Sequence, residues 1–153
     1  MRNKAGFSLL ELMIVIGIIA ILSAIVTPNI IAWYQDQGLK SAVVELQSDL
    51  QLAKMSAVKQ NQGCSVNINV GAGSYNIPCT GKTVSLGTFP GGVVFDSPDG
   101  SATDNLLTFT SRGICSPFGS VYLTNRNTSA YYRTQVFISG GVATSKWDGA
   151  NWR

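Results

Sequence analysis

The chain has 153 residues, of which 45% are apolar and 12% are charged, so it suits one domain and is no disordered polyelectrolyte. Its net charge of +3 depends on Arg2 and Lys4, which precede the first apolar run; the remaining chain has 9 basic and 8 acidic residues. Bulk charge therefore predicts no charged partner. The absence of histidine excludes Ser-His-Asp and Cys-His catalysis and imidazole metal sites, so we expect no enzyme, cofactor or metal.

A long apolar run begins at Leu9. Residues 9–26 read LLELMIVIGIIAILSAIV, with Glu11 as the single charge, and this approaches the ~20 apolar residues that cross a bilayer as a helix. The basic leader predicts a cytoplasmic N-terminus, with the rest of the chain outside. A cleaved secretory signal is the alternative, but the run is longer than a usual signal core and lacks a small-x-small cleavage triplet. A membrane anchor is the favoured interpretation.

The residues after Pro28 have helical periodicity. Apolar residues recur in steps of 4, 3, 4, 3 and 4: Leu39, Val43, Leu46, Leu50, Ala53 and Ala57. Charged residues stand between them: Lys40, Glu45, Asp49, Lys54 and Lys59. This pattern predicts an amphipathic helix that packs its apolar face on a globular head. If the helix continues from the apolar run, Pro28 should bend or loosen it, and Gly38 is a second soft point.

Residues 61–153 contain 13 of the 16 glycines, and apolar residues there alternate with polar ones, which predicts a β-rich head. Segments 64–70 and 74–79 form a predicted hairpin with Gly71-Ala72 as a type II′ turn, which places Ile68 opposite Tyr75. Further strands are expected at 93–95, 106–109, 120–124, 135–139 and 142–147. The predicted fold class is α+β: a long N-terminal α-helix, comprising a membrane stem and an amphipathic half, packed on an antiparallel β-sheet head.

Three cysteines in an exported chain suit an oxidising compartment. The predicted hairpin places Cys64 opposite Cys79, so we expect a disulfide between them, with Cys115 left over. A Cys79–Cys115 bond is the alternative. The absence of a CxxC motif and of histidine argues against zinc. The aspartates of DSPDGSATD (96–104) could bind calcium, but their spacing matches no calcium loop, and Asp-Gly is an ordinary turn.

The segment KAGFSLLELMIVI (4–16) resembles the class III signal of the type IV filament superfamily, which includes type IV pilins and type II secretion pseudopilins. A short basic leader ends in Gly6, Phe7 follows, and Glu11 is the fifth residue after that point; Pro28 also falls where such subunits commonly carry a proline. The resemblance implies that a prepilin peptidase cuts between Gly6 and Phe7 and methylates the new N-terminus. The Glu11 carboxylate then has an α-ammonium partner one helical turn away, or on a neighbouring subunit.

The resemblance also implies an organisation and a function. Residues 1–6 form the leader, 7–34 the transmembrane and filament-core helix, 35–60 the amphipathic half and 61–153 the head. The chain is then a structural subunit of a type IV pilus or type II secretion pseudopilus, which polymerises with other pilins through its N-terminal helix. The other partners are the prepilin peptidase and an inner-membrane assembly platform with its ATPase. The expected location is the bacterial inner membrane, single-pass with a periplasmic head, and later a periplasmic or extracellular filament.

Resemblance extends to the head. Segments 46–61, 107–113, 119–125 and 135–142 are similar to GspH/FimT-like minor pilins and pseudopilins. One branch of that group binds DNA through a Gly-Arg-x-Arg stretch near the C-terminus, where this chain reads GGVA (140–143). A DNA-binding minor pilin for DNA uptake is therefore the alternative function, with Arg112, Arg126 and Arg133 as candidate phosphate contacts beside Tyr131 and Tyr132. The missing arginines argue against DNA as a partner, and solvated loop residues are the favoured interpretation.

Overall fold

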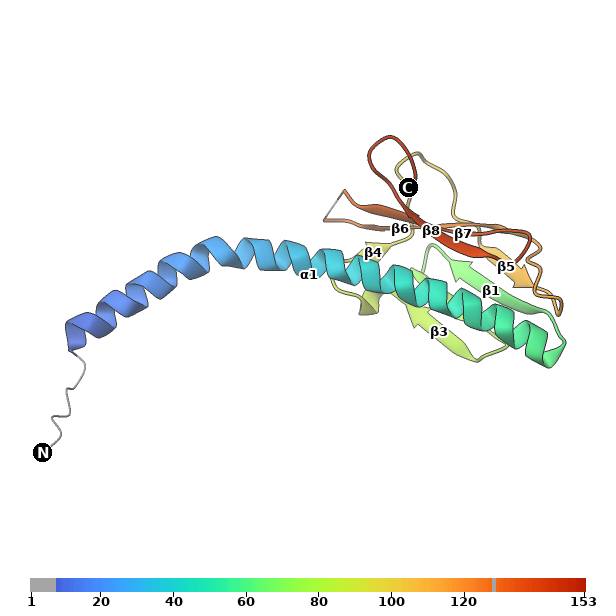
Figure 1. Ribbon diagram of the computed structural model, residues 1–153, viewed down its shortest axis with the longest axis horizontal. Coiled ribbons are helices and arrows are strands. Elements are labelled where there is room, and N and C mark those ends of the chain that lie inside the picture. Colours follow the sequence, from blue (N-terminus) through green and yellow to red (C-terminus); the bar gives the residue numbers. More distant parts are fainter. Residues whose placement is uncertain (1–7, 128) are drawn as a thin grey trace, which may run out of the picture. The chain divides into compact units, whose positions relative to one another are not determined.

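The computed structural model describes residues 8–127 and 129–153, apart from the side chains of residues 25–29 (Figure 1). The described residues form two compact units, which divide between Trp33 and Tyr34. The only α-helix of the described residues, α1, runs from Leu9 to Gln60 and contributes to both units. Among the described residues, no helix combines the length and the hydropathy that a membrane span requires.

The described residues of the second unit form eight strands and one short 3-10 helix. They are β1 (Cys64–Asn69), β2 (Ser74–Ile77), β3 (Lys82–Ser85), η1 (Leu86–Thr88), β4 (Val93–Val94), β5 (Leu106–Phe109), β6 (Gly119–Asn125), β7 (Tyr131–Val136) and β8 (Val142–Lys146). The strands form two antiparallel four-stranded sheets, in the orders β3-β2-β1-β5 and β4-β6-β7-β8. The predicted α+β class is confirmed, but the sheet is divided in two. Strand β3 was not predicted because KTVS has a single apolar residue, and β7 begins four residues earlier than predicted because YYR at its start does not alternate between apolar and polar residues.

The predicted register of the β1–β2 hairpin is confirmed. Ile68 pairs with Tyr75, and the alternate residues of both strands are buried on one face. The predicted type II′ turn is wrong. Such a turn needs a positive φ at Gly71, whereas the positive φ of 59° belongs to Gly73, and the Gly73 amide donates to the Val70 carbonyl at 3.2 Å. The change of turn type leaves the pairing of the strands unchanged.

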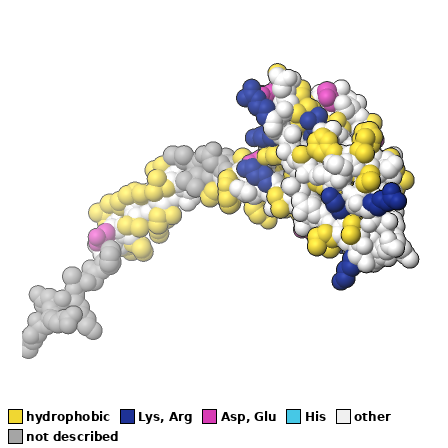
Figure 2. Space-filling model, turned by 45° about the vertical axis from the view of Figure 1, so that its right-hand side comes forward, with side chains coloured by type: hydrophobic (Ala, Val, Ile, Leu, Met, Phe, Trp, Pro, Cys, Tyr) yellow, Lys and Arg dark blue, Asp and Glu magenta, His cyan; other side chains and the backbone are white. Residues whose placement is uncertain are grey.

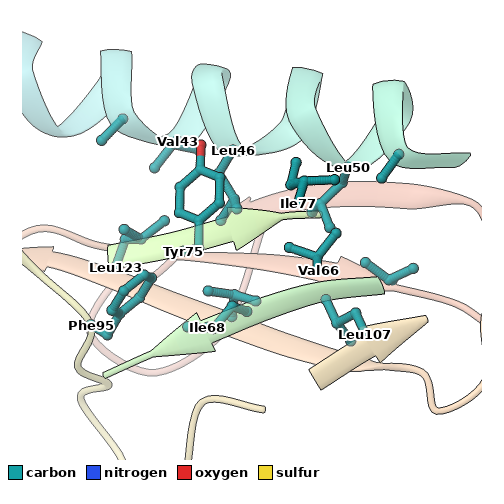
Figure 3. Packing of buried hydrophobic residues seen from close by; sticks show 14 of the residues in the cluster. Val43, Leu46, Leu50, Val66, Ile68, Tyr75, Ile77, Phe95, Leu107 and Leu123 are labelled. Carbon is teal, nitrogen blue, oxygen red and sulfur yellow. The ribbon is translucent and has the colours of Figure 1, made fainter. Parts of the chain in front are cut away.

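The second half of α1 supplies one wall of the hydrophobic core. All six predicted apolar positions of the helix are buried: Leu39, Val43, Leu46, Leu50, Ala53 and Ala57. They pack with strand residues of both sheets, and Figure 3 shows Val66, Ile68, Ile77, Leu107 and Leu123 beneath the helix. A fully buried Leu or Ile side chain contributes about 1.5–3 kcal/mol relative to an exposed one. This apolar face therefore holds the helix and the head together as one unit.

Gly38 is a point of close packing and not a soft point of the helix. A β-carbon at this position would overlap the carbonyl oxygen of Pro90, in the loop before β4. The helix is fastened to the head nearby, because the Asn125 side-chain amide donates to the Gln35 carbonyl at 3.0 Å. At the other end of the head, the Lys54 ammonium donates to the Gly140 carbonyl at 2.9 Å. Polar contacts therefore secure both ends of the packed helical half.

Candidate functional site

The first half of α1 presents an almost wholly apolar surface. Between Leu9 and Leu22 every large hydrophobic side chain is exposed, from Leu9 at 76% to Val15 at 43%. Hydrophobic side chains predominate on the visible face of this stretch (Figure 2). A helix that is apolar all round is stable only when lipid or other protein surrounds it. This stretch is therefore the candidate assembly surface of the chain, and we call residues 9–22 the apolar stem.

The predicted assembly and processing residues lie at or near the apolar stem. Glu11 is exposed in the first turn of α1, where the helix dipole favours a negative charge. Within residues 8–127 and 129–153 no ion pair involves Glu11. Gly6 and Phe7 lie outside the described residues, as does the side chain of Pro28. The cleavage site, the ammonium partner of Glu11 and the role of Pro28 therefore stay predictions.

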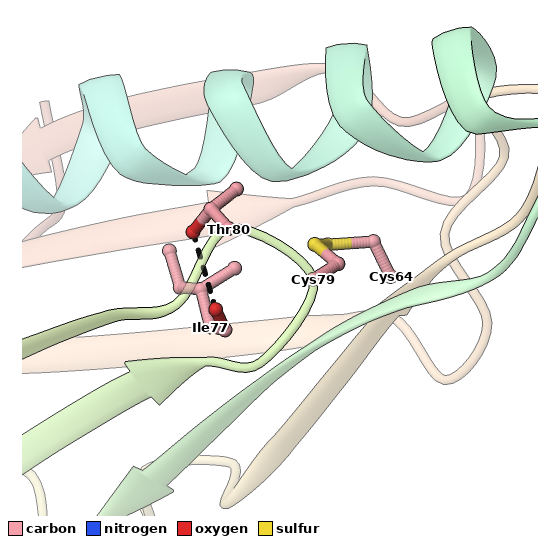
Figure 4. Close-up of a disulfide and its surroundings, with 4 residues drawn as sticks. All are labelled: Cys64, Ile77, Cys79 and Thr80. Carbon is pink, nitrogen blue, oxygen red and sulfur yellow. Dashed lines mark hydrogen bonds between the residues drawn. A yellow bond between two sulfur atoms is a disulfide. The ribbon is translucent and has the colours of Figure 1, made fainter.

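The predicted disulfide joins Cys64 and Cys79, with their α-carbons 5.6 Å apart (Figure 4). It ties the start of β1 to the segment after β2, where the Thr80 hydroxyl donates to the Ile77 carbonyl at 3.1 Å. Cys115 is free and buried, and burial raises the pKa of its thiol. The alternative Cys79–Cys115 pairing is therefore wrong, and the predicted hairpin register accounts for the observed bond.

A buried polar cluster joins the helix to β2 and β3. Asp49 is one of the charged residues that stand between the apolar positions of the helix, yet its side chain is only 3% exposed. Its carboxylate accepts a hydrogen bond from the Tyr75 hydroxyl at 2.7 Å and pairs with the Lys82 ammonium, also at 2.7 Å. Lys82 also contacts the Glu45 carboxylate. Figure 3 shows the Tyr75 hydroxyl pointing toward α1 from below.

The same cluster shifts the pKa of two of its members. Burial, followed by the hydrogen bond to Asp49, raises the pKa of Tyr75. Hydrogen bonds to Asp49 and then Glu45 raise the pKa of Lys82. Both groups therefore keep their protons at neutral pH, and the cluster positions the head on the helix. The sequence signal for this cluster was weak, since one acidic residue on a helix gives no sign that its partners lie 26 and 33 residues away.

The structure does not gather the three candidate DNA-contacting arginines. Arg126 directly follows β6, and Arg133 lies opposite Tyr122 near the middle of that strand. Arg112 precedes Gly113, which packs against the turn after β7, beside Lys54. Lys and Arg side chains accordingly occupy separate places on the face seen in Figure 2. Arg112, Arg126 and Arg133 therefore come from different parts of the head, and Arg133 lies in a strand rather than a loop; whether they contact DNA stays a prediction.

The aspartates of the 96–104 segment are used in turns. The Asp96 and Asp99 carboxylates accept hydrogen bonds from the backbone amides of Ser97 and Ser101, at 2.9 and 3.1 Å. Asp104 accepts one from the amide of Ser120, near the start of β6, at 2.7 Å. In the part of the chain that the structure describes, no three metal-binding side chains converge. Each of the three carboxylates therefore has a hydrogen-bond donor from the backbone, as expected for aspartates in turns.

Comparison with known protein families assigns the chain to one of them. The family model described as Type II transport protein GspH matches residues 42–141, which is more than half of the chain. The chain belongs to the GspH family. The prokaryotic N-terminal methylation motif matches residues 1–27 and covers the predicted processing site. The chain is therefore a type IV pilin-like subunit of the minor pilin and pseudopilin group, as the N-terminal and head segments predicted, and this family is structural rather than enzymatic.

Individual relatives agree with this assignment. A 32-residue segment is 62% identical to the type IV wide pilus major component PilA4 of Thermus thermophilus; it covers 21% of this chain and 24% of that protein. Two crystal structures of the type IV minor pilin FimU of Pseudomonas aeruginosa match the fold. The first has a TM-score of 0.55 and 18% sequence identity, and the match covers 72% of this chain and 90% of the FimU chain. The second has a TM-score of 0.52 and 16% sequence identity, and the match covers 75% of this chain and 97% of the FimU chain. A long helix packed on antiparallel strands is therefore the shared pilin fold.

Proposed function

We propose that this chain is a structural subunit that polymerises, through its N-terminal helix, into a type IV pilus or a type II secretion pseudopilus. The observation that carries this proposal is the contrast between the two halves of α1. In the second half one face of the helix is buried against the head, whereas the apolar stem exposes its large hydrophobic side chains on all sides. A subunit of this kind gains a cover for its stem only from lipid or from the stems of other subunits.

The proposed route begins with processing and a membrane-bound stage. Prepilin peptidase removes residues 1–6 and methylates Phe7, in keeping with the N-terminal methylation motif over residues 1–27. The chain then rests in the bacterial inner membrane with its head in the periplasm. An assembly platform with its ATPase moves it into the filament. Stems that faced lipid then face one another, which exchanges one apolar surrounding for another at modest cost.

Glu11 has a specific role in this proposal. A carboxylate near one end of an apolar helix is costly in lipid, up to ~2.5–3.5 kcal/mol at the bilayer centre, unless a cation partners it. The α-ammonium that processing creates at Phe7 is such a partner, either within the subunit or on its neighbour. When the partner belongs to a neighbour, the pair fixes the axial offset between adjacent stems. Assembly should therefore depend on Glu11 more than membrane insertion does.

The test compares two carboxylates of the same helix in the native host. Glu11→Ala should reach the membrane at normal or higher levels and be lost from sheared filaments. Asp36→Ala is the matched control, because Asp36 forms an ordinary i,i+4 surface pair with Lys40 at 2.6 Å. Immunoblots of membrane and filament fractions measure, for each variant, the ratio of the chain in filaments to the chain in the membrane. Normal incorporation of Glu11→Ala into filaments would refute the role of Glu11. Absence of the chain without substitutions from filaments would refute the proposed function.

A further inference from the structure

The last eight residues of the chain form a small hairpin that was not predicted from the sequence. The amide of Lys146 donates to the carbonyl of Arg153 at 2.5 Å, and the Arg153 amide returns a hydrogen bond at 2.9 Å. Asp148 closes the turn, because its carboxylate accepts hydrogen bonds from two backbone amides and pairs with the Arg153 guanidinium at 2.6 Å. Trp147 and Trp152 face each other across this hairpin, with ring centroids 5.2 Å apart.

The hairpin places aromatic rings on the outer face of the second sheet. Trp152 lies 5.5 Å from the Tyr122 ring, and the Arg133 guanidinium lies over the Trp152 ring at 5.0 Å. Trp147 continues the line of β8, and its amide donates to the Tyr131 carbonyl at 3.0 Å. Tyr131 and Trp147 are therefore neighbours on adjacent strands, on the face opposite the core. Tyr122 is buried, whereas Tyr131, Trp147 and Trp152 are only half-buried.

Tyr131 and Trp147 line an open groove of about 730 Å³, which also includes Ser129 and Lys146. A second hollow of about 520 Å³ shares Tyr131 and Ser129 with it. Volumes of this size are typical of ligand sites. We define the aromatic groove as these two adjoining hollows. Its lining combines the rings of Tyr131 and Trp147 with hydroxyl, amide, basic and acidic side chains.

We propose that the aromatic groove binds a neutral, β-1,4-linked glycan. Each sugar of such a chain has a face of C–H groups, which packs on an aromatic ring, and a rim of hydroxyls that both donate and accept hydrogen bonds. β-1,4-linked glycans are flat ribbons, and a flat ribbon suits an open groove along a sheet with two neighbouring rings. Asn127 and Ser129 provide exposed polar groups beside those rings.

The charges around the aromatic groove favour a neutral glycan over single-stranded DNA. A DNA groove combines stacking rings with a continuous track of cations along the backbone. Here Arg153 is paired with Asp148, and Arg133 is covered by Trp152. Lys146 and Arg126 remain, but they line different hollows, and Asp96 lies in the same hollow as Arg126. The groove therefore has the rings of a stacking site without the cation track that a polyphosphate needs.

The test measures binding to the full chain in lauryldimethylamine oxide, a detergent without a sugar headgroup that could compete for the site. Isothermal titration uses cellohexaose and chitohexaose as β-1,4 probes, maltohexaose as a curved α-linked comparison and oligothymidylate as the DNA comparison. We expect saturable binding of at least one β-1,4 probe and weaker or no binding of the other two. Trp147→Ala should weaken the binding about tenfold, which corresponds to about 1.4 kcal/mol, because it removes one of the two stacking rings.

Two further variants keep the result interpretable. Ser129→Leu adds bulk, but no ring, at a surface position of the groove and removes no core contact, so it should block binding even where Trp147→Ala disturbs the hairpin. Phe118→Ala is the matched control, because Phe118 is a 55% exposed aromatic residue that lines neither hollow. Failure of both β-1,4 probes to bind would overturn the proposal. Binding that survives both groove variants, or tighter binding of oligothymidylate than of either probe, would overturn it as well.

Discussion

Replacing Lys82 tests whether the buried polar cluster positions the head on the helix. Lys82→Met keeps the length of the side chain and removes the charge that faces the buried Asp49 carboxylate at 2.7 Å. Breaking a fully buried ion pair costs about 3–5 kcal/mol, because it leaves one charge uncompensated. Lys82 is itself 35% exposed, so water can replace part of its contact. We therefore expect a loss of about 1–3 kcal/mol in the free energy of unfolding.

The matched control is Lys40→Met on the same protein. Lys40 pairs with Asp36 at 2.6 Å, but both side chains are substantially exposed, so the pair should contribute about 0–1 kcal/mol. Urea unfolding of the full chain in a fixed detergent, followed by near-ultraviolet circular dichroism, measures both variants. If Lys82→Met costs no more than Lys40→Met, the buried cluster does not stabilise the packing of the head and this reasoning is wrong.

Three further predictions concern packing, the disulfide and alkaline pH. Gly38→Ala should lower the free energy of unfolding by about 1–3 kcal/mol through overpacking. Gly17→Ala should not lower it, because nothing lies within 4 Å of the new methyl group. Urea unfolding measures both variants. Non-reducing peptide mapping should find Cys64 joined to Cys79, and reduction of this 15-residue loop should cost about 3 kcal/mol. The free energy of unfolding should fall above pH about 10, because the raised pKa of Tyr75 keeps its hydroxyl protonated in the folded chain but not in the unfolded chain. Urea unfolding at several pH values checks this. Tyr75→Phe should weaken the pH dependence of stability.

Local periodicity predicted the elements that are regular and buried on one side. Six apolar positions spaced by three and four residues identified the buried face of the helix, and strict alternation identified the β1–β2 register, which in turn identified the disulfide. These features depend on residues close together in the sequence. The same reasoning could not find Asp49 as a buried residue, since its partners Tyr75 and Lys82 come from distant strands.

The unpredicted part of the head depends on contacts between distant segments. The pattern of β3 is too short and too exposed to distinguish a strand from a loop. Strand order is also beyond local patterns: β5 pairs with β1 while β6 and β7 join a different sheet, so one expected sheet is two. The C-terminal hairpin is stabilised by ring contacts of Trp152 with Trp147, Tyr122 and Arg133, and no short-range signal indicates these contacts.

The central claim is that this chain becomes a processed filament subunit, and the intact mass of the chain in filaments from its own host tests it most directly. The account predicts filaments that contain the chain without residues 1–6 and with one methyl group on Phe7. It also predicts that Gly6→Ala, which obstructs the peptidase, leaves the full-length precursor in the membrane fraction. Filaments that contain the chain with residues 1–6 still attached, or filaments that lack the chain altogether, would contradict the account.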